Sequence, residues 1–181
     1  MQNTQDLPPV PKDLVEKTNA LYSYLMHSGA PLNMQLQAVY HYLDEFQPYI
    51  AQFVSCSKGC SHCCRIDIQI TTLEAEYIQV YTGIPIQLKA TLSSITTGHR
   101  DACPFLLKDN ACGIYSVRPL MCRIYHAFGE PENCKHGRRQ VHYGQSPNFG
   151  NDIFANLVRW THHVVINGGG ALLDIRDFFR R

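Results

Sequence analysis

The sequence lacks any apolar run approaching the roughly 20 residues that a membrane-spanning helix requires. Its first residues, MQNTQDLPPVPKD, lack the basic and apolar regions of a signal peptide, so a cytoplasmic location is expected. The formal net charge is only +1, which gives no global reason to expect a membrane or nucleic-acid partner. There is no G-x-G-x-x-G pattern after a predicted strand and no P-loop, so nucleotide chemistry has little support.

The composition is that of a folded globular protein, with 181 residues, 45% apolar and 17% charged. We predict a flexible leader over residues 1–11, because the prolines of LPPVP fix φ and remove backbone donors. A single domain is expected over residues 12–181, with a cysteine-rich metal-binding region at about 53–137. The predicted fold class is mainly α, a helical scaffold around an irregular cysteine-rich region with one or two short strands.

Helical periodicity predicts four helices outside the cysteine-rich region. The first ends at Ser28-Gly29-Ala30-Pro31, and the second has Asn33 as its N-cap and Pro48 as the position of a kink. Three glycines at 168–170 should end the third, and a last short helix follows over 171–179. The predicted ranges, in order, are residues 14–25, 33–53, 151–166 and 171–179.

The middle of the chain shows mixed signals. Alternation of isoleucine with polar residues over 66–71 predicts a strand, and the capping box at 71–74 predicts a helix to about Thr82, ending at Gly83. A further helix is expected over 85–96. The remaining expectations are a hairpin turn at 108–110, a short helix from about Ser116, and a loop over 135–150.

Eight cysteines in a reducing compartment more often bind metal or act in redox chemistry than form disulfides; a periplasmic disulfide protein is the alternative. Four lie within nine residues, as candidate metal ligands: Cys56, Cys60, Cys63 and Cys64. The C-x-x-C spacing within this group lets two thiolates reach one ion from a tight turn. The adjacent fourth thiol suggests either a polynuclear centre or one ligand next to a cysteine that binds no metal. The alternative for any of these cysteines is a small buried side chain with a packing role only.

The other four cysteines are dispersed, and their spacing alone is a weak signal. They complete the set of candidate ligands: Cys103, Cys112, Cys122 and Cys134. Two groups of four cysteines fit either two four-thiolate sites or one shared site with additional thiols. The sequence pattern leaves both arrangements open. His62, inside the first group, is the best histidine candidate, although packing explains most histidines.

Basic residues gather around the cysteines. Lys58 and Arg65 lie in the first segment, and residues 100–140 contain seven basic against four acidic side chains. A zinc ion or [4Fe–4S] cluster with four thiolates is doubly negative, and burying it requires nearby cations or hydrogen-bond donors. We therefore assign supporting roles around the centre to Arg65, Arg118 and Arg123, whereas residues 138–139 could equally form a solvated basic face.

The motifs of the middle region resemble the YkgJ-like cysteine-cluster family of zinc- or iron-chelating domains. The matching segments are CSHCCR at 60–65, TTLE at 71–74, CPFL at 103–106 and CGIYSVRPLMCRIY at 112–125. The resemblance covers about residues 53–137, with three residues between Cys56 and Cys60 where the family has two. It implies metal binding by these cysteines but no defined reaction; one relative, flagellin lysine N-methylase, contains a similar cluster.

The sequence thus predicts a zinc- or iron-chelating protein, the metal held by thiolates from residues 56–64 and 103–134, with zinc or iron, including a [4Fe–4S] cluster, as cofactor. The alternative is a metal-dependent enzyme component, an oxidoreductase or one related to protein lysine methyltransferases. A zinc-ribbon-like adaptor is a third hypothesis, which the near-neutral charge disfavours for nucleic acid. The expected partner is a metal ion, and no protein partner is identified.

Overall fold

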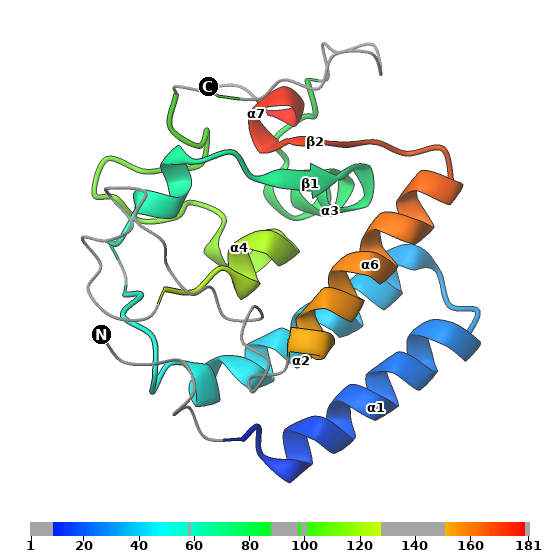
Figure 1. The fold of residues 1–181 in the computed structure, drawn as a ribbon. Helices are drawn as coiled ribbons and strands as arrows, with labels where there is room; N and C mark the ends of the chain where they lie inside the picture. Colours follow the sequence, from blue (N-terminus) through cyan, green and yellow to red (C-terminus); the bar gives the residue numbers. More distant parts are fainter. Residues whose placement is uncertain (1–8, 58, 88–97, 99–100, 128–150, 180–181) are drawn as a thin grey trace. The chain divides into compact units, whose positions relative to one another are not determined.

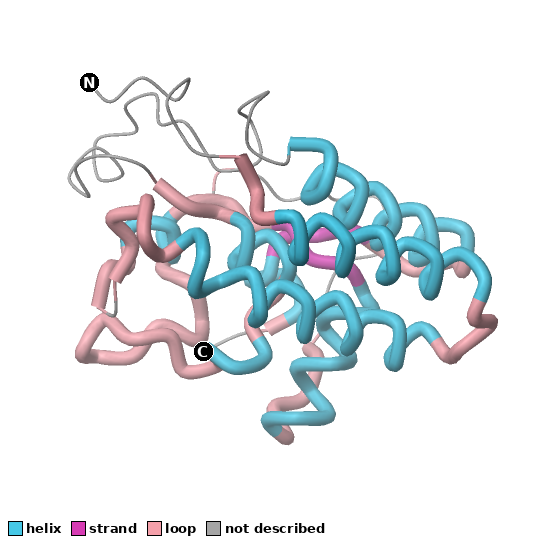
Figure 2. The backbone as a smooth tube through the Cα atoms, turned by 90° about the horizontal axis from the view of Figure 1, so that it is seen from below, coloured by secondary structure: helices cyan, strands magenta, loops and turns pink. Residues whose placement is uncertain are grey.

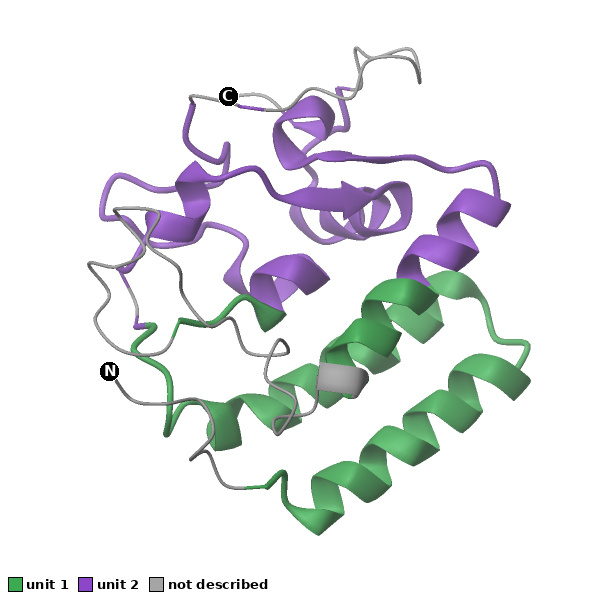
Figure 3. Cartoon of the chain, viewed as in Figure 1, with its two compact units in different colours: residues 1–56, 124–160 green, residues 57–123, 161–181 purple. Residues whose placement is uncertain are grey.

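The computed structural model describes residues 9–57, 59–87, 98, 101–127 and 151–179. The chain divides into two compact units, one of residues 1–56 and 124–160 and the other of residues 57–123 and 161–181 (Figure 3). Each unit therefore combines segments that lie far apart in the sequence. Among the described residues, no helix combines the length and apolarity needed to cross a membrane.

The first unit is built from helices. These are α1 (Lys12–His27), α2 (Leu32–Ile50) and the first part of α6 (Asn151–Asn167) (Figure 1). The rings of Phe46 and Phe154 meet edge-on with centroids 5.3 Å apart, and the Tyr22 hydroxyl donates to the Ile153 carbonyl at 2.7 Å. These contacts pack the start of α6 against both α1 and α2.

The second unit contains the only sheet of the described residues. Strand β1 (Gln69–Thr71) pairs antiparallel with β2 (Leu172–Asp174), with Ile70 opposite Leu173 (Figures 1 and 2). The strands lead directly into α3 (Thr72–Thr82) and α7 (Ile175–Phe178). The segment after the first cysteine group is therefore hydrogen-bonded to the end of the chain.

Helix α3 has the local signals that the sequence predicts. The Thr71 side chain accepts from the Glu74 backbone N–H, and the Glu74 carboxylate accepts from the Thr71 N–H, which completes a capping box. The helix ends at Gly83, whose φ of 70° is the left-handed conformation that glycine adopts without strain.

A separate apolar core fills the second unit. Its members come from both strands, from α3 and α7, and from the cysteine-bearing loops, and three thiols, those of Cys103, Cys112 and Cys122, pack against it. The buried members are Ile68, Ile70, Ala75, Ile78, Phe105, Ile114, Val117, Ala171, Leu173, Ile175, Phe178 and Phe179. The core thus supports the loops that carry the thiols.

The predicted fold class is confirmed: the protein is mainly helical, and its described ranges contain one short two-stranded sheet. Three local predictions need correction. The first residues of the segment 171–179 form β2 rather than helix, because they pair with β1 across a long sequence separation. The predicted strand 66–71 is regular only from Gln69, and α2 begins before Asn33, with Pro31 at the N-cap.

The remaining middle-region predictions have mixed outcomes. The turn at 108–110 is confirmed, and the expected short helix is a 3-10 turn, η3 (Tyr115–Val117), followed by α4 (Leu120–Ile124). The predicted leader, the helix over 85–96 and the loop over 135–150 lie wholly or largely outside the described residues. The single-domain organisation stays a prediction.

Candidate metal centre

The six described cysteines of the second unit lie on or beside three short structures. Cys63 and Cys64 belong to η2 (His62–Arg65), a single 3-10 turn, and Cys60 comes just before it. Cys103 and Cys112 flank the 103–113 loop, and Cys122 lies on α4. None of the seven described cysteines forms a disulfide. The eighth, Cys134, lies outside the described residues.

Backbone hydrogen bonds join the two cysteine segments. The Cys103 N–H donates to the Cys64 carbonyl at 2.7 Å, so these two residues are held side by side. The loop after Cys103 then folds back on itself, with a bridge between Leu106 and Cys112. Asn110 sits at the turn with a φ of 63°, a conformation that asparagine tolerates better than most residues. The fold therefore brings both ends of this loop towards η2.

Five thiols form one interacting group, which we call the thiol group: Cys63, Cys64, Cys103, Cys112 and Cys122. Each member interacts electrostatically with at least three of the others. Two members come from the first cysteine segment and three from the second, separated by almost 40 residues of sequence. The fold thus brings thiols from both segments close enough for their charges to interact.

Burial governs the protonation of the thiol group. It raises the pKa of Cys103 to about 11 and also raises the pKa values of Cys112 and Cys122. The thiol of Cys64 donates a hydrogen bond to Cys63, which lowers the pKa of Cys63 and raises that of Cys64. Cys63 is therefore the first member to become a thiolate, and the others need a compensating positive charge.

Arg118 supplies positive charge beside the thiol group. It favours the thiolate forms of Cys63, Cys112 and Cys122, and its guanidinium lies 4.2 Å from the Tyr115 ring centroid. Its Nε atom is buried and has no hydrogen-bond partner among the described residues. A buried donor of this kind needs an acceptor, and a negatively charged metal–thiolate centre could provide one.

Arg123 supports the loop that carries Arg118. Its side chain is buried, and it donates from Nε to the Arg118 carbonyl at 2.8 Å and from Nη2 to the Ser116 carbonyl at 2.6 Å. The guanidinium fork thereby fixes the backbone around Arg118. Arg65, by contrast, lies exposed at the end of η2, and a role near the thiols stays a prediction for it.

The other predicted ligands are placed differently. Cys56 belongs to the first unit, where its side chain is exposed and its Sγ accepts from the Ala127 N–H at 3.4 Å. Cys60 and His62 are half-buried in the second unit, next to the thiol group in sequence. The ligand role of each of these residues stays a prediction.

No preformed metal cage is present in the part of the chain that the structure describes: no three histidine, cysteine, aspartate or glutamate side chains have that arrangement. The Cys63 and Cys64 thiols share a hydrogen bond, so at least one of them is protonated in this arrangement. Metal binding requires that thiols lose their protons and is coupled to local ordering. The thiol group would therefore have to close around an ion or a cluster.

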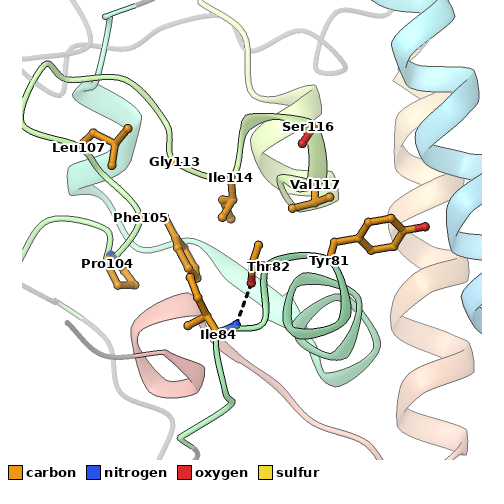
Figure 4. A pocket seen from close by; sticks show the side chains of 10 residues that line it. All are labelled: Tyr81, Thr82, Ile84, Pro104, Phe105, Leu107, Gly113, Ile114, Ser116 and Val117. Carbon is orange, nitrogen blue, oxygen red and sulfur yellow. Dashed lines mark hydrogen bonds between the residues drawn. The ribbon is translucent and has the colours of Figure 1, made fainter.

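A pocket of about 540 Å³ lies beside the loops that carry Cys103 and Cys112 (Figure 4). Its lining is apolar apart from three hydroxyl groups, and the Thr82 hydroxyl is already used by the Ile84 N–H at 3.2 Å. The lining residues are Tyr81, Thr82, Ile84, Pro104, Phe105, Leu107, Gly113, Ile114, Ser116 and Val117. No cysteine is among them, so the thiols do not line this pocket.

Sequence reasoning missed two buried residues that contact the cysteine segments. Asp174 and Arg176, from β2 and α7, hydrogen-bond to the backbone between residues 64 and 68 and to Asp101. No local motif marks them. The only sequence signal is the presence of Asp174 and Arg176 two positions apart within the largely apolar segment 171–179.

The fold and the thiol group together define a small cysteine-cluster domain on a helical scaffold. A family model with the description "Putative zinc- or iron-chelating domain", CxxCxxCC, matches residues 55–146, just over half of the chain. The chain belongs to this family, as its motifs predict, and the family supports metal chelation without specifying the metal. No curated protein and no solved structure matches the chain.

Proposed function

We propose that the protein chelates zinc or iron through a single metal–thiolate centre built on the thiol group. The observation that carries this proposal is that five thiols from both cysteine segments interact electrostatically beside a buried arginine donor, with the Cys64 and Cys103 backbones joined by a hydrogen bond. A shared centre is favoured over two separate four-thiolate sites because the members interact across the segments. Cys56, Cys60 and Cys134 are the remaining candidate ligands.

The donor set fits the metals that the family description names. Thiolates bind zinc in closed tetrahedral sites and also hold iron–sulfur clusters, including [4Fe–4S]. Zinc would give a redox-inert structural centre, whereas an iron–sulfur cluster would supply electron transfer. In either case Arg118 would offset the negative charge of the centre, and Arg123 would hold Arg118 in place.

We place this function in the cytoplasm. Thiolate ligands must stay reduced, and the cytoplasm keeps thiols reduced.

The test is purification of the full chain without oxygen, followed by metal analysis and visible absorption spectroscopy. Bound iron with visible absorbance would identify an iron–sulfur centre, and bound zinc without colour would identify a zinc site. Cys63→Ser and Cys122→Ser are expected to remove most of the metal, because each deletes a thiol of the group from a different segment.

Met121→Leu is the matched control for Cys122→Ser, since it changes the preceding residue of α4 and leaves every thiol in place. Ser61→Ala serves the same purpose for Cys63→Ser. Full metal content in both cysteine variants would contradict the proposed centre. An absence of zinc and iron from the wild-type protein, also after anaerobic reconstitution, would contradict metal chelation altogether.

A further inference from the structure

Arg176 lies on α7, outside the residues 55–146 that the family model matches. Its side chain is buried, with 7% of its surface exposed, and its guanidinium donates hydrogen bonds in three directions. Nη1 bonds both carboxylate oxygens of Asp174 at 2.9 and 3.0 Å, and Nε bonds the Asp101 carbonyl at 2.8 Å. Nη2 bonds the carbonyls of Ile66 at 3.1 Å and Cys64 at 3.3 Å.

Asp174 fixes the position of this guanidinium. Its carboxylate is almost fully buried, accepts from the Ile68 N–H at 2.7 Å, and caps α7 by accepting from the Arg176 N–H at 2.9 Å. The Ile175 N–H also donates to the Ile68 carbonyl at 3.0 Å. The ion pair is therefore tied to the backbone that leads from η2 into β1.

The carbonyls that Arg176 holds belong to the two cysteine segments. Cys64 is itself a member of the thiol group, and Asp101 comes two residues before Cys103. The Cys64 carbonyl also accepts from the Cys103 N–H, so it receives donors from both Cys103 and Arg176. One rigid guanidinium fork thus links the backbones on which two thiols of the group sit, a geometry that a lysine cannot reproduce.

We propose that Arg176 is a positioning residue of the metal–thiolate centre, and that β2 and α7 are part of this site although they lie outside the cysteine-cluster motif. Arg176 sets the separation of the Cys64 and Cys103 backbones and so the reach of their sulfur atoms towards a common ion. This inference rests on the proposed function and extends it to a residue that touches no metal.

The test uses cobalt as a spectroscopic probe of the full chain, prepared without metal and without oxygen. Co²⁺ is titrated into the wild type, Arg176→Lys and Arg159→Lys, and both the affinity and the visible d–d spectrum at saturation are measured. Arg176→Lys is expected to weaken Co²⁺ binding by about 10- to 100-fold, as loss of supporting contacts does in other metal sites, and to shift the spectrum. Arg159→Lys, an identical change at an exposed position of α6, should alter neither.

The d–d spectrum separates positioning from general stability, because a variant that only unfolds more easily keeps the wild-type spectrum once it is saturated. A folded Arg176→Lys protein with wild-type affinity and spectrum overturns the inference. If Arg176→Lys does not fold, Asp174→Asn decides by the same two measurements, since it keeps Arg176 but removes the carboxylate charge that orients it. A wild-type protein that binds neither Co²⁺ nor, after anaerobic reconstitution, iron would instead contradict the proposed function. If it takes up iron but no Co²⁺, the iron content and visible absorption spectrum of the reconstituted centre replace the two Co²⁺ measurements in the same comparison of variants.

Discussion

The Glu74 carboxylate accepts a hydrogen bond from the backbone N–H of Leu120, with 2.7 Å between Oε1 and N. Leu120 is the first residue of α4, the helix that carries Cys122. The other carboxylate oxygen accepts from both the N–H and the hydroxyl of Thr71 at 2.8 Å. One buried side chain therefore caps α3 and holds the start of the helix that brings the last described thiol into the group.

Replacement of Glu74 by glutamine tests this connection. The single amide oxygen of glutamine can replace only one of the two carboxylate oxygens. Its NH₂ group would then face either the Leu120 N–H or the Thr71 donors, which would lose their acceptor. Leaving such buried donors unsatisfied costs about 1–3 kcal/mol, so Glu74→Gln should lower the free energy of unfolding by that amount, measured with urea. Glu76→Gln, on the exposed face of the same helix, is the matched control. Equal stabilities of the two variants would argue against the role of Glu74.

Arg118 offers a second prediction, because its buried Nε has no hydrogen-bond partner within the described ranges and its charge acts on three thiols. Arg118→Met keeps the apolar part of the side chain and removes the charge and the donors. We expect metal affinity to fall by about 10- to 100-fold in competition with a chelator. Lys108→Met removes a positive charge from an exposed position on the neighbouring loop and should leave the affinity unchanged. A similar loss in both variants would indicate only a general effect of charge.

The predicted elements that the structure bears out have strong local signals. The capping box at Thr71 and Glu74 and the glycine at 83 bound α3 at both ends, and three glycines follow α6. The strand at 172–174 was missed because its apolar residues suit a short helix as well, and only pairing with β1 decides between them. That pairing joins residues about 100 positions apart, which no local pattern can indicate.

In the candidate metal centre, too, local features could be predicted from the sequence and long-range contacts could not. Cysteine spacing and family motifs made the thiols candidate ligands and gave Arg118 a supporting role, and both roles stay predictions. The structure shows that Arg118 lies where its charge favours the thiolate of Cys63. The sequence could not indicate which thiols meet, because this depends on how the loop after Cys103 folds and on where its backbone bonds to Cys64. The link from Arg176 to that same carbonyl depends on the sheet and was equally hidden.

The cysteines should differ in their importance for metal retention. Cys103→Ser removes a member of the thiol group whose backbone is tied to Cys64, and it should lose most of the metal. Cys56→Ser should lose less, because the Cys56 Sγ is exposed and already accepts a hydrogen bond from Ala127. Metal content per chain after gel filtration distinguishes the two. Retention of metal by Cys103→Ser together with its loss from Cys56→Ser would reverse the assignment.

Tyr42 provides a test of the first unit that does not involve metal. Its hydroxyl is buried in α2 and shares a 2.5 Å hydrogen bond with Thr18 of α1, and burial raises the pKa of Tyr42 to about 12. In the unfolded chain the Tyr42 hydroxyl ionises near pH 10.0. The contribution of the neutral Tyr42 hydroxyl to the free energy of unfolding is therefore fully present below that pH, and it is lost as the pH rises towards about 12.

We therefore expect the stability advantage of the wild type over Tyr42→Phe to shrink by about 2–3 kcal/mol between those pH values, since one pKa unit corresponds to about 1.4 kcal/mol. Urea unfolding of both proteins at several alkaline pH values, followed by helical circular dichroism, gives this difference directly. Comparison of the two proteins cancels the titration of cysteines and lysines, which both share. Tyr81→Phe, at an exposed tyrosine of α3, serves as control, and its curve should run parallel to that of the wild type. A parallel curve for Tyr42→Phe would show that the Tyr42 hydroxyl is not buried between α1 and α2.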